Sequence, residues 1–396
     1  MLSMPNFYQQ IESELTGNIL PFWMRHTVDH ENGGFYGALS NDLQIHNEVE
    51  RSSVLCARIL WTFSAAYQRF PRPEYLSMAG HAYDYLRKAF WDQEYGGIYW
   101  TVEKSGAPLS PRKQTYAQAF AIYGLAEYYA ASGSQESLEL AQKLFYLLEN
   151  QAADMQFGGY LEARARNWES ITDMRLSDQE PNCPKSMNTL LHVLEAYTRL
   201  YSLWPDPLLR QSLRNLLQIM QSHVIDHENG RFHLFFERNW QVVSDKISYG
   251  HDIEGSWLLF EAAEVLGEEP LRTHISLAAV KMAESAYEHG RDSDGAILNE
   301  ADSTGLIDDD KHWWPQAEAL VGFYNAYKLS GNIDFLCATR QVWQVISEKF
   351  IDRQHGEWYK ILNRAGVPYR EHYKTGPWEC PYHSARACLE MLKRLN

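Results

Sequence analysis

The sequence predicts an all-α fold, an (α/α)6 barrel made of six helix-pair repeats with short β-hairpin insertions. A glycine-containing phrase recurs six times along the chain and first reads DHENGGFYGALSND, from residue 29. Between successive phrases the apolar residues follow helical spacing, over a length that fits two helices. Because one helix pair cannot bury its apolar face alone, the six pairs are expected to stack on one another.

The repeated phrases are evenly spaced and share one pattern. Each combines glycine with alternating apolar and polar positions, which is typical of a short strand or hairpin. No Pro/Ser-rich linker interrupts the chain, so residues 1–396 are expected to form a single domain. A closed barrel is favoured over an open solenoid, because neither end has the polar pattern of a capping repeat. The marker glycines are Gly34, Gly97, Gly159, Gly230, Gly295 and Gly356, separated by 63, 62, 71, 65 and 61 residues.

Composition excludes several classes of function. The chain has 36 basic and 51 acidic side chains, a net charge of −15, which argues against binding to nucleic acid or an anionic membrane. No apolar run approaches the roughly 18 residues of a membrane span, and no signal peptide is visible. The five cysteines have no CxxC spacing, which predicts reduced thiols in a cytoplasmic protein and no structural zinc.

Polar side chains recur near the start of the helix that follows each phrase, so this helix is expected to be the inner one of its pair. Pro315 and Pro381 are expected in the first turns of two of these helices. Residues three or four apart share a helix face, and several of the polar residues have that spacing. The candidate site residues are Arg58, Tyr116, Asn188, His192, His251, Glu254, Trp314, Glu318, Trp378 and His383.

Each candidate also has an ordinary structural interpretation. A single histidine at a helix start is commonly a cap, but three at matched repeat positions favour a shared pocket. Arg58 could form a buried ion pair, and Trp314 and Trp378 could be barrel packing. The pair His251 and Glu254 has the spacing of a helical metal motif. A divalent site would need further carboxylates, whereas the other repeats supply aromatic residues and arginine, so no metal is expected.

Five stretches resemble the N-acylglucosamine 2-epimerase superfamily, and within it the branch that acts on β-1,4-linked disaccharides. They are CARILWTFS, NTLLHVLEAY, GHDIEGSWLL, WWPQAEALVGF and GPWECPYHSAR, and the similarity extends through all six repeats. The resemblance implies an (α/α)6 barrel, either monomeric or a homodimer, that reversibly epimerises C2 of the reducing-end glucose of a disaccharide substrate. Cellobiose would give glucosyl-mannose, and lactose would give epilactose. Alternatives are an N-acylglucosamine 2-epimerase, an aldose–ketose isomerase, a glycoside hydrolase or a non-enzymatic sugar-binding barrel.

The chemistry of C2 epimerisation suits the candidate histidines. Once the sugar ring opens, a base can remove the C2 proton to give a cis-enediolate, and a proton returns to the other face. Histidine titrates near neutral pH, and a helix start favours its neutral form. We therefore expect His251 and His383 to act as acid and base, with Glu254 orienting the His251 ring.

The remaining candidates are expected to bind charge and hydroxyl groups. Arg58 and His192 would stabilise the enediolate, since preorganised donors are a large part of catalysis. The other expected substrate contacts are Trp314 and Trp378 as apolar platforms, Tyr116 and Asn188 as hydroxyl partners, and Glu318. The resemblance also implies an acidic residue in a loop at the substrate, either Asp178 or Glu180. No cofactor is required. A glycoside hydrolase would instead need two carboxylates, for which Glu254 and Glu318 are candidates.

Overall fold

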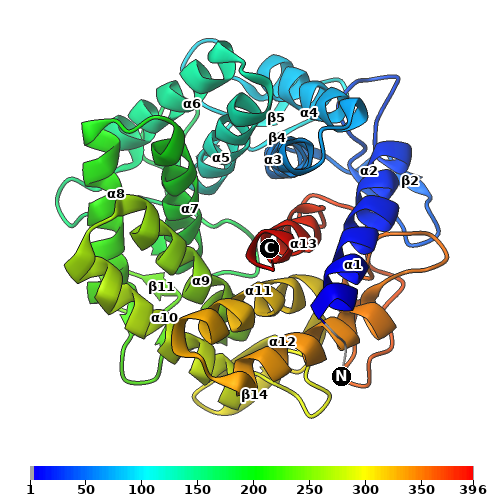
Figure 1. The fold of residues 1–396 in the computed structure, drawn as a ribbon. Coiled ribbons are helices and arrows are strands. Elements are labelled where there is room, and N and C mark those ends of the chain that lie inside the picture. Colours follow the sequence, from blue (N-terminus) through cyan, green and yellow to red (C-terminus); the bar gives the residue numbers. More distant parts are fainter. Residues whose placement is uncertain (1–3, 396) are drawn as a thin grey trace.

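The computed structural model describes residues 4–395, in which the helices form two concentric rings (Figure 1). The helix that follows each repeated phrase lies in the inner ring, as predicted. The inner helices are α3 (Ser53–Arg69), α5 (Thr115–Ser132), α7 (Met187–Leu203), α9 (Tyr249–Leu266), α11 (Trp313–Ser330) and α13 (Tyr382–Arg394). The prediction of an all-α (α/α)6 barrel is confirmed.

The outer ring consists of α1 (Met4–Glu14) and α2 (Leu20–His26), then α4 (Pro73–Tyr85), α6 (Gln135–Leu147), α8 (Pro207–Ile219), α10 (Glu269–His289) and α12 (Ile333–Val345). A π turn, η1 (Leu15–Ile19), joins α1 to α2. Other π turns end four outer helices: η2 (Leu86–Phe90), η3 (Leu148–Ala152), η4 (Met220–Val224) and η5 (Ile346–Phe350). Within residues 4–395, no helix is long and apolar enough to cross a membrane.

The two ends of the chain close the barrel. The N-terminal helices α1 and α2 lie outside the C-terminal helix α13, so the sixth pair takes its inner helix from one end and its outer helix from the other (Figure 1). Buried hydrogen bonds join them to the last repeat: Trp23 Nε1 donates to Glu357 Oε2 at 2.8 Å, and Trp358 Nε1 donates to Glu14 Oε1 at 2.8 Å.

Inner helices are buried nearly all round because they contact both neighbours and an outer helix. In α5 every residue from Thr115 to Glu127 is buried, which explains its nearly continuous apolar sequence. Of the two prolines expected in first turns, Pro315 is the third residue of α11, as predicted. Pro381 lies one residue earlier than predicted, at the N-cap of α13, where its carbonyl accepts from the N–H of Ala385 at 2.8 Å.

Short strands join each repeat to the next at the end of the barrel where the inner helices begin. A two-residue strand before each of the first five inner helices pairs antiparallel with the hairpin of the following repeat. These pairs are β3 (Arg51–Ser52) with β4 (Thr101–Val102), β6 (Lys113–Gln114) with β7 (Ala163–Arg164), β8 (Lys185–Ser186) with β11 (Phe235–Phe236), β12 (Ile247–Ser248) with β13 (Glu300–Asp302), and β15 (Lys311–His312) with β16 (Ile361–Leu362). A bridge between Leu39 and Thr375 completes the circle.

The remaining strands extend these hairpins. They are β1 (Ala38–Leu39) with β2 (Ile45–His46), β5 (Pro108–Ser110) with β4, β9 (Ile225–Asp226) with β10 (Arg231–Phe232), and β14 (Gly305–Asp308) with β13. The glycine turns between them are held by aspartates. Asp92 accepts from two backbone N–H groups of its turn and binds Nζ of Lys113 at 2.9 Å, with both side chains fully buried.

The same aspartate–cation pair recurs around the ring, as Asp29–Arg51, Asp154–Lys185, Asp292–Lys311 and Asp352–Lys374. In the fourth repeat Ile247 takes the place of the cation, and Asp226 instead accepts from Asn229 Nδ2 at 2.7 Å. Each cation precedes an inner helix and each aspartate belongs to the repeated phrase. These pairs therefore fix the hairpins that surround the mouth of the barrel.

Candidate active site

The N-terminal ends of the inner helices surround a cavity of about 370 Å³. Its wall also contains Glu180 from the segment between β7 and α7, His312 and Trp313 at the start of α11, and Glu379 just before α13. Nine of the ten predicted residues line it: Arg58, Tyr116, Asn188, His192, His251, Glu254, Trp314, Trp378 and His383. Residues chosen at matched positions of the repeats therefore line one pocket, although they come from six separate helices.

Arg58 is a buried cation with no carboxylate partner among residues 4–395. Its Nη2 donates to the hydroxyl of Tyr116 at 2.7 Å, and its Nη1 lies 3.6 Å from Cys380 Sγ. The guanidinium stacks 4.2 Å above the centre of the Phe120 ring. The alternative of a buried ion pair is therefore wrong. A buried charge without a counter-ion is costly, so this site favours an anionic oxygen in the cavity.

His383 is held from behind by Glu318, whose Oε1 lies 2.6 Å from the ring Nδ1. Arg386 donates to the same oxygen at 2.7 Å, and Trp257 Nε1 donates to the other at 3.1 Å. Burial raises the pKa of Glu318, but these two donors oppose the rise and stabilise the carboxylate form. A carboxylate only accepts hydrogen bonds, so Nδ1 of His383 carries its proton. Burial lowers the pKa of His383 well below the usual value, and the charge of Arg58 lowers it further.

Glu318 does not lie where its predicted contact with the substrate requires. Glu318 is buried beneath the cavity and is not part of its wall. Its spacing of four residues from Trp314 does place both on the same face of α11. However, Glu318 lies one turn deeper, where His383 and Arg386 bind its oxygens. The residue therefore positions His383.

His251 has a different partner from His383. Its Nδ1 lies 2.7 Å from the hydroxyl of Ser248, the N-cap residue of α9. Burial lowers the pKa of His251 to about 3, and the nearby His192 adds to this effect. The expectation that Glu254 orients the His251 ring is wrong, because the Glu254 carboxylate accepts from Arg386 instead. The His251 ring thus contacts the residue just before its own helix, whereas Glu254 contacts Arg386 of α13.

A network centred on Arg386 was missed in the sequence. Arg386 is buried and hydrogen-bonds to Glu195, Glu254, Glu318 and the hydroxyl of Tyr382. Burial raises the pKa of Glu195, but Arg386 and His192 more than offset this and lower it to about 2. Burial raises the pKa of Glu254 to about 7, with Glu318 adding to the rise and Arg386 opposing it.

Helical spacing could have revealed this network. Glu195 follows His192 by three residues, and its Oε2 lies 2.9 Å from the His192 Nδ1. Arg386 likewise follows His383 by three residues on α13. Each of these charged residues therefore shares a helix face with a pocket histidine, one turn further into the barrel.

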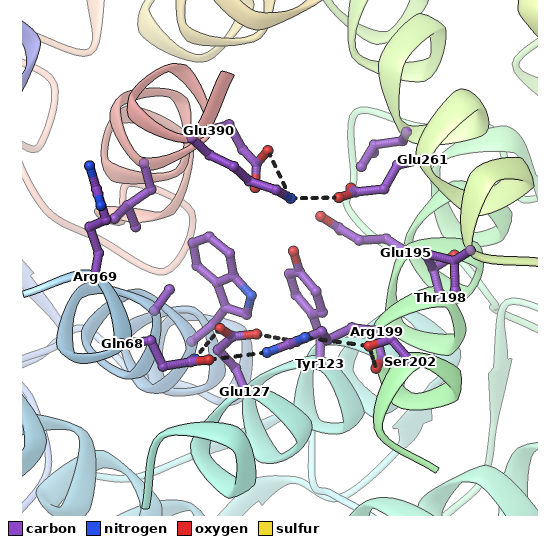
Figure 2. A pocket seen from close by; sticks show the side chains of 16 residues that line it. Gln68, Arg69, Tyr123, Glu127, Glu195, Thr198, Arg199, Ser202, Glu261 and Glu390 are labelled. Carbon is purple, nitrogen blue, oxygen red and sulfur yellow. Dashed lines mark hydrogen bonds and ion pairs between the residues drawn. The ribbon is translucent and has the colours of Figure 1, made fainter. Parts of the chain in front are cut away.

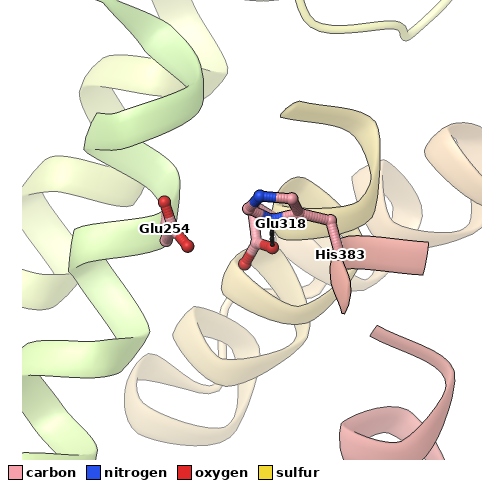
Figure 3. A group of neighbouring side chains, drawn as sticks. All are labelled: Glu254, Glu318 and His383. Carbon is pink, nitrogen blue, oxygen red and sulfur yellow. Dashed lines mark hydrogen bonds and ion pairs between the residues drawn. The ribbon is translucent and has the colours of Figure 1, made fainter. Parts of the chain in front are cut away.

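Glu254, Glu318 and His383 form a cluster that resembles a metal site (Figure 3). Their potential ligand atoms all lie within 4.8 Å of one another. The charge of this cluster is already met by protein groups, because one nitrogen of Arg386, Nη2, binds both carboxylates and His383 binds Glu318. Glu254 and Glu318 therefore belong to an ion-pair network that supports His383.

Trp314 lies between the two candidate acid/base histidines. Its ring centre is 4.7 Å from that of His251 and 5.7 Å from that of His383. Gly250 permits this position, since a Cβ there would lie 2.5 Å from the Trp314 ring. Trp378 lies elsewhere in the wall, 5.9 Å from the ring of Tyr116. Both tryptophans therefore face the cavity as well as packing within it.

Two polar side chains of the wall have groups available to a ligand. The Oδ1 atom of Asn188 is buried without a hydrogen-bond partner in the described part of the chain. Glu180 lines the cavity, and burial raises its pKa to about 7. Asp178, the other candidate in this segment, is 95% exposed and binds Arg175. The structure therefore favours Glu180 over Asp178 as the acidic residue nearer the cavity.

A second cavity, of about 420 Å³, lies at the opposite end of the barrel (Figure 2). It is bordered by residues near the C-terminal ends of the inner helices, including Glu127, Arg199 and Glu261. Arg199 pairs with Glu127, and Lys393 pairs with Glu261, so its charges are largely matched. Although it is larger, it contains none of the pocket histidines. The histidine-lined cavity is therefore the candidate active site.

Comparisons with known proteins agree with this arrangement. A cellobiose 2-epimerase from Bacteroides fragilis is 44% identical over 97% of this chain and 98% of its own. The structure of a cellobiose 2-epimerase from Bacillus thermoamylovorans superposes with a TM-score of 0.93 at 38% identity, over 98% of this chain and 99% of that one. An N-acylglucosamine 2-epimerase from Mus musculus is 23% identical over 98% of this chain and 91% of its own. The model of the N-acylglucosamine 2-epimerase family matches residues 34–387, and the chain belongs to this family.

Proposed function

We propose that this protein is an enzyme that reversibly epimerises C2 of the reducing-end glucose of β-1,4-linked disaccharides. One observation carries the proposal: a buried, unpaired Arg58 shares its cavity with His251 and His383. Deprotonating C2 of an open-chain aldose moves negative charge onto O1. A cation without a counter-ion and two histidines of lowered pKa supply what that step needs.

In the proposed reaction, the sugar ring opens and one histidine removes the C2 proton through its free nitrogen. The C2–H electrons form the C1–C2 double bond, and the carbonyl electrons move onto O1, giving a cis-enediolate. Arg58 and His192 stabilise the charge on O1. The histidine on the other face of C2 then donates its own proton to C2, which inverts the centre and restores the aldehyde.

This cycle requires one extra proton in the pocket, held on the histidine that will donate. Burial and the charge of Arg58 lower the pKa of His383. In the described part of the chain, however, His383 has a carboxylate, that of Glu318, behind its ring to stabilise an imidazolium, whereas His251 has none, so His383 is the better carrier of the two. Glu254 has a pKa of about 7 and is a further reservoir for a proton near neutral pH. After each turnover the two histidines have exchanged states, and exchange with water restores the starting arrangement.

The disaccharide as substrate is supported by the relatives. Identity to the cellobiose 2-epimerase is 44%, compared with 23% for the N-acylglucosamine 2-epimerase, at similar coverage. Trp314, Trp378 and Asn188 offer apolar platforms and an amide for sugar rings and hydroxyls. Cellobiose and lactose are therefore the substrates to test first, with glucosyl-mannose and epilactose as products.

A glycoside hydrolase is not supported by the geometry. The pair of carboxylates that hydrolysis needs would be Glu254 and Glu318. Glu318 is outside the cavity wall, and both carboxylates bind the same nitrogen of Arg386. They cannot flank a glycosidic oxygen from opposite sides.

One chromatogram tests the proposal. Cellobiose incubated with the enzyme should give glucosyl-mannose. Two glucose molecules would mean hydrolysis, glucosyl-fructose alone would mean aldose–ketose isomerisation, and unchanged cellobiose would contradict both the activity and the substrate. We further propose a cytoplasmic location, because the five cysteines are free thiols. The proposal of a monomer or homodimer rests on the family resemblance alone.

A further inference from the structure

Three inner helices begin after a serine at the N-cap, but one of these serines does not cap its helix. Ser52 accepts from the backbone N–H of Leu55, and Ser186 accepts from that of Thr189, as N-cap serines commonly do. Ser248 makes no such bond and instead binds Nδ1 of His251 at 2.7 Å. The Ser248 hydroxyl therefore contacts a pocket histidine and does not cap α9.

The three histidines of the pocket that the sequence singled out, His192, His251 and His383, therefore differ in what lies behind the ring. His192 faces the carboxylate of Glu195 at 2.9 Å, and His383 faces that of Glu318 at 2.6 Å. In the described part of the chain, His251 pairs with no carboxylate, and its Nδ1 faces only a hydroxyl. A carboxylate accepts hydrogen bonds only, whereas a serine hydroxyl both donates and accepts.

We propose that Ser248 is a positioning residue that keeps His251 the neutral histidine of the pair. Because a hydroxyl can donate or accept, it leaves the His251 ring able to take either tautomer. The inference rests on the proposed epimerase function. A carboxylate behind a ring stabilises the imidazolium, and a hydroxyl does not. The different partners assign the extra proton of the cycle to His383 and leave His251 as the resting base.

Other groups around His251 are compatible with this role. The charged and titratable side chains that share its cavity come from five of the inner helices and from the segments before α11, α13 and β8. They are Arg58 of α3, Tyr116 of α5, His192 of α7, Glu254 of α9, His312 before α11, Glu379 before α13, His383 of α13 and Glu180 before β8. Of these, only His192 acts on the His251 pKa, and it lowers it in the same direction as burial. None of the carboxylates among these side chains raises the His251 pKa to make up for the absence of a carboxylate behind the ring.

A matched pair of variants isolates the charge. Ser248→Asp places a carboxylate behind the ring, and Ser248→Asn places an uncharged group of the same size there. Ser248→Asp should raise the His251 pKa. The acid limb of the pH profile of kcat/KM should therefore lie about one pH unit or more higher in Ser248→Asp than in Ser248→Asn. Ser248→Thr keeps the hydroxyl and should keep the wild-type profile. Ser248→Ala should lower kcat without moving the limb.

The control is the same pair at a serine that does cap its helix. Ser52→Asp and Ser52→Asn should have matching acid limbs, because Ser52 binds only the backbone of α3. Identical limbs for Ser248→Asp and Ser248→Asn would overturn the proposal. So would equal displacement by the Ser52 pair, which would indicate a general charge effect at the mouth of the barrel.

Nitrogen-15 NMR of labelled histidine, without substrate, tests the pairing separately from the activity. The His251 signals, identified from a His251→Gln spectrum and followed as the pH is lowered, should show the ring protonating at a higher pH in Ser248→Asp than in wild type and Ser248→Asn. A ring that protonates at the same pH in all three would overturn the proposal. The expected NMR result together with no epimerisation by wild type would support the role of Ser248 while refuting the proposed function.

Discussion

Glu318 lies directly behind His383, with its Oε1 2.6 Å from the ring Nδ1. Both side chains are buried, and Arg386 donates to the same carboxylate oxygen. The contact fixes the proton on Nδ1 and leaves the other ring nitrogen to the cavity. We therefore expect Glu318 to act on the reaction through His383 without contacting the sugar.

Glu318→Gln should therefore reduce kcat far more than it changes KM. An amide can turn its NH2 group toward Nδ1 and select the wrong tautomer, and it does not stabilise an imidazolium. We expect kcat to fall by about 10²-fold or more, as for other losses of acid–base function. Steady-state kinetics on cellobiose measures the changes in kcat and KM separately. Glu127→Gln, in the far cavity, is the matched control and should keep wild-type kinetics. A raised KM with unchanged kcat would return Glu318 to a substrate-binding role.

His251→Ala and His383→Ala should each nearly abolish turnover, with a loss of about 10²- to 10⁴-fold. Each removes one of the two groups that exchange a proton with C2. Sugar affinity should change little, because Trp314, Trp378 and Asn188 remain in the cavity. Product formation is followed by chromatography, and cellobiose binding by calorimetry. Near-normal turnover in either variant would refute the acid/base assignment.

Arg58→Ala should lower kcat by about 10²- to 10³-fold and raise KM by less. The reason is that Arg58 has no carboxylate partner and its charge is needed only when O1 becomes negative. Arg58→Lys should restore part of the activity at most, because lysine lacks the planar fork that binds Tyr116 and stacks on Phe120. If kcat were unchanged and only KM rose, Arg58 would serve ground-state binding.

Asp252 has no role in the proposed reaction and allows a test of how folding stability depends on pH. Its Oδ1 accepts from the backbone N–H of Phe232 at 2.7 Å, and burial raises its pKa to about 8. An unfolded aspartate titrates near pH 3.9, so between about pH 4 and 8 the folded protein holds a proton that the unfolded chain has lost. This carboxyl group therefore contributes stability that is present at low pH and lost as pH rises.

Asp252→Asn keeps the acceptor for Phe232 and removes the titration. The Tm of the variant relative to wild type should therefore increase steadily from pH 5 to pH 8. Thermal denaturation followed by circular dichroism at several pH values measures this difference. A constant difference across the range would mean that Asp252 is ionised in the folded protein.

The sequence predicted the barrel and the pocket because both depend on a repeated local pattern. Six phrases at nearly constant spacing indicated six helix pairs, and polar residues at matched positions indicated which helix ends converge. Contacts between repeats are not encoded in that pattern. Glu318 was assigned to substrate because its spacing from Trp314 gives the helix face but not the depth along the axis. Glu254 was assigned to His251 for the same reason, since spacing does not show that Arg386 would bind it from another helix.

The closure of the barrel was also only partly predictable. The six phrases imply six inner helices, but the sixth outer helix comes from residues 4–26, which precede the first phrase. Its contacts with α13 depend on the path of the whole chain. Similarly, Ser248 looks like an ordinary N-cap in the sequence. Only the structure shows that its hydroxyl turns to His251.

The final prediction concerns the origin of the proton that arrives at C2. The two histidines have lowered pKa values and share a cavity that opens at the mouth of the barrel, so their protons should exchange with water between turnovers. Epimerisation of cellobiose in D₂O should place deuterium at C2 of the new mannose residue and nowhere in the non-reducing glucose. The glycosidic bond should stay intact, and added chelator or NAD should leave the rate unchanged. NMR and mass spectrometry of the product locate the label. If the product retained protium fully at C2, the proton would have crossed between faces without exchange or moved as a hydride, and two exchangeable histidines could not be the acid and base.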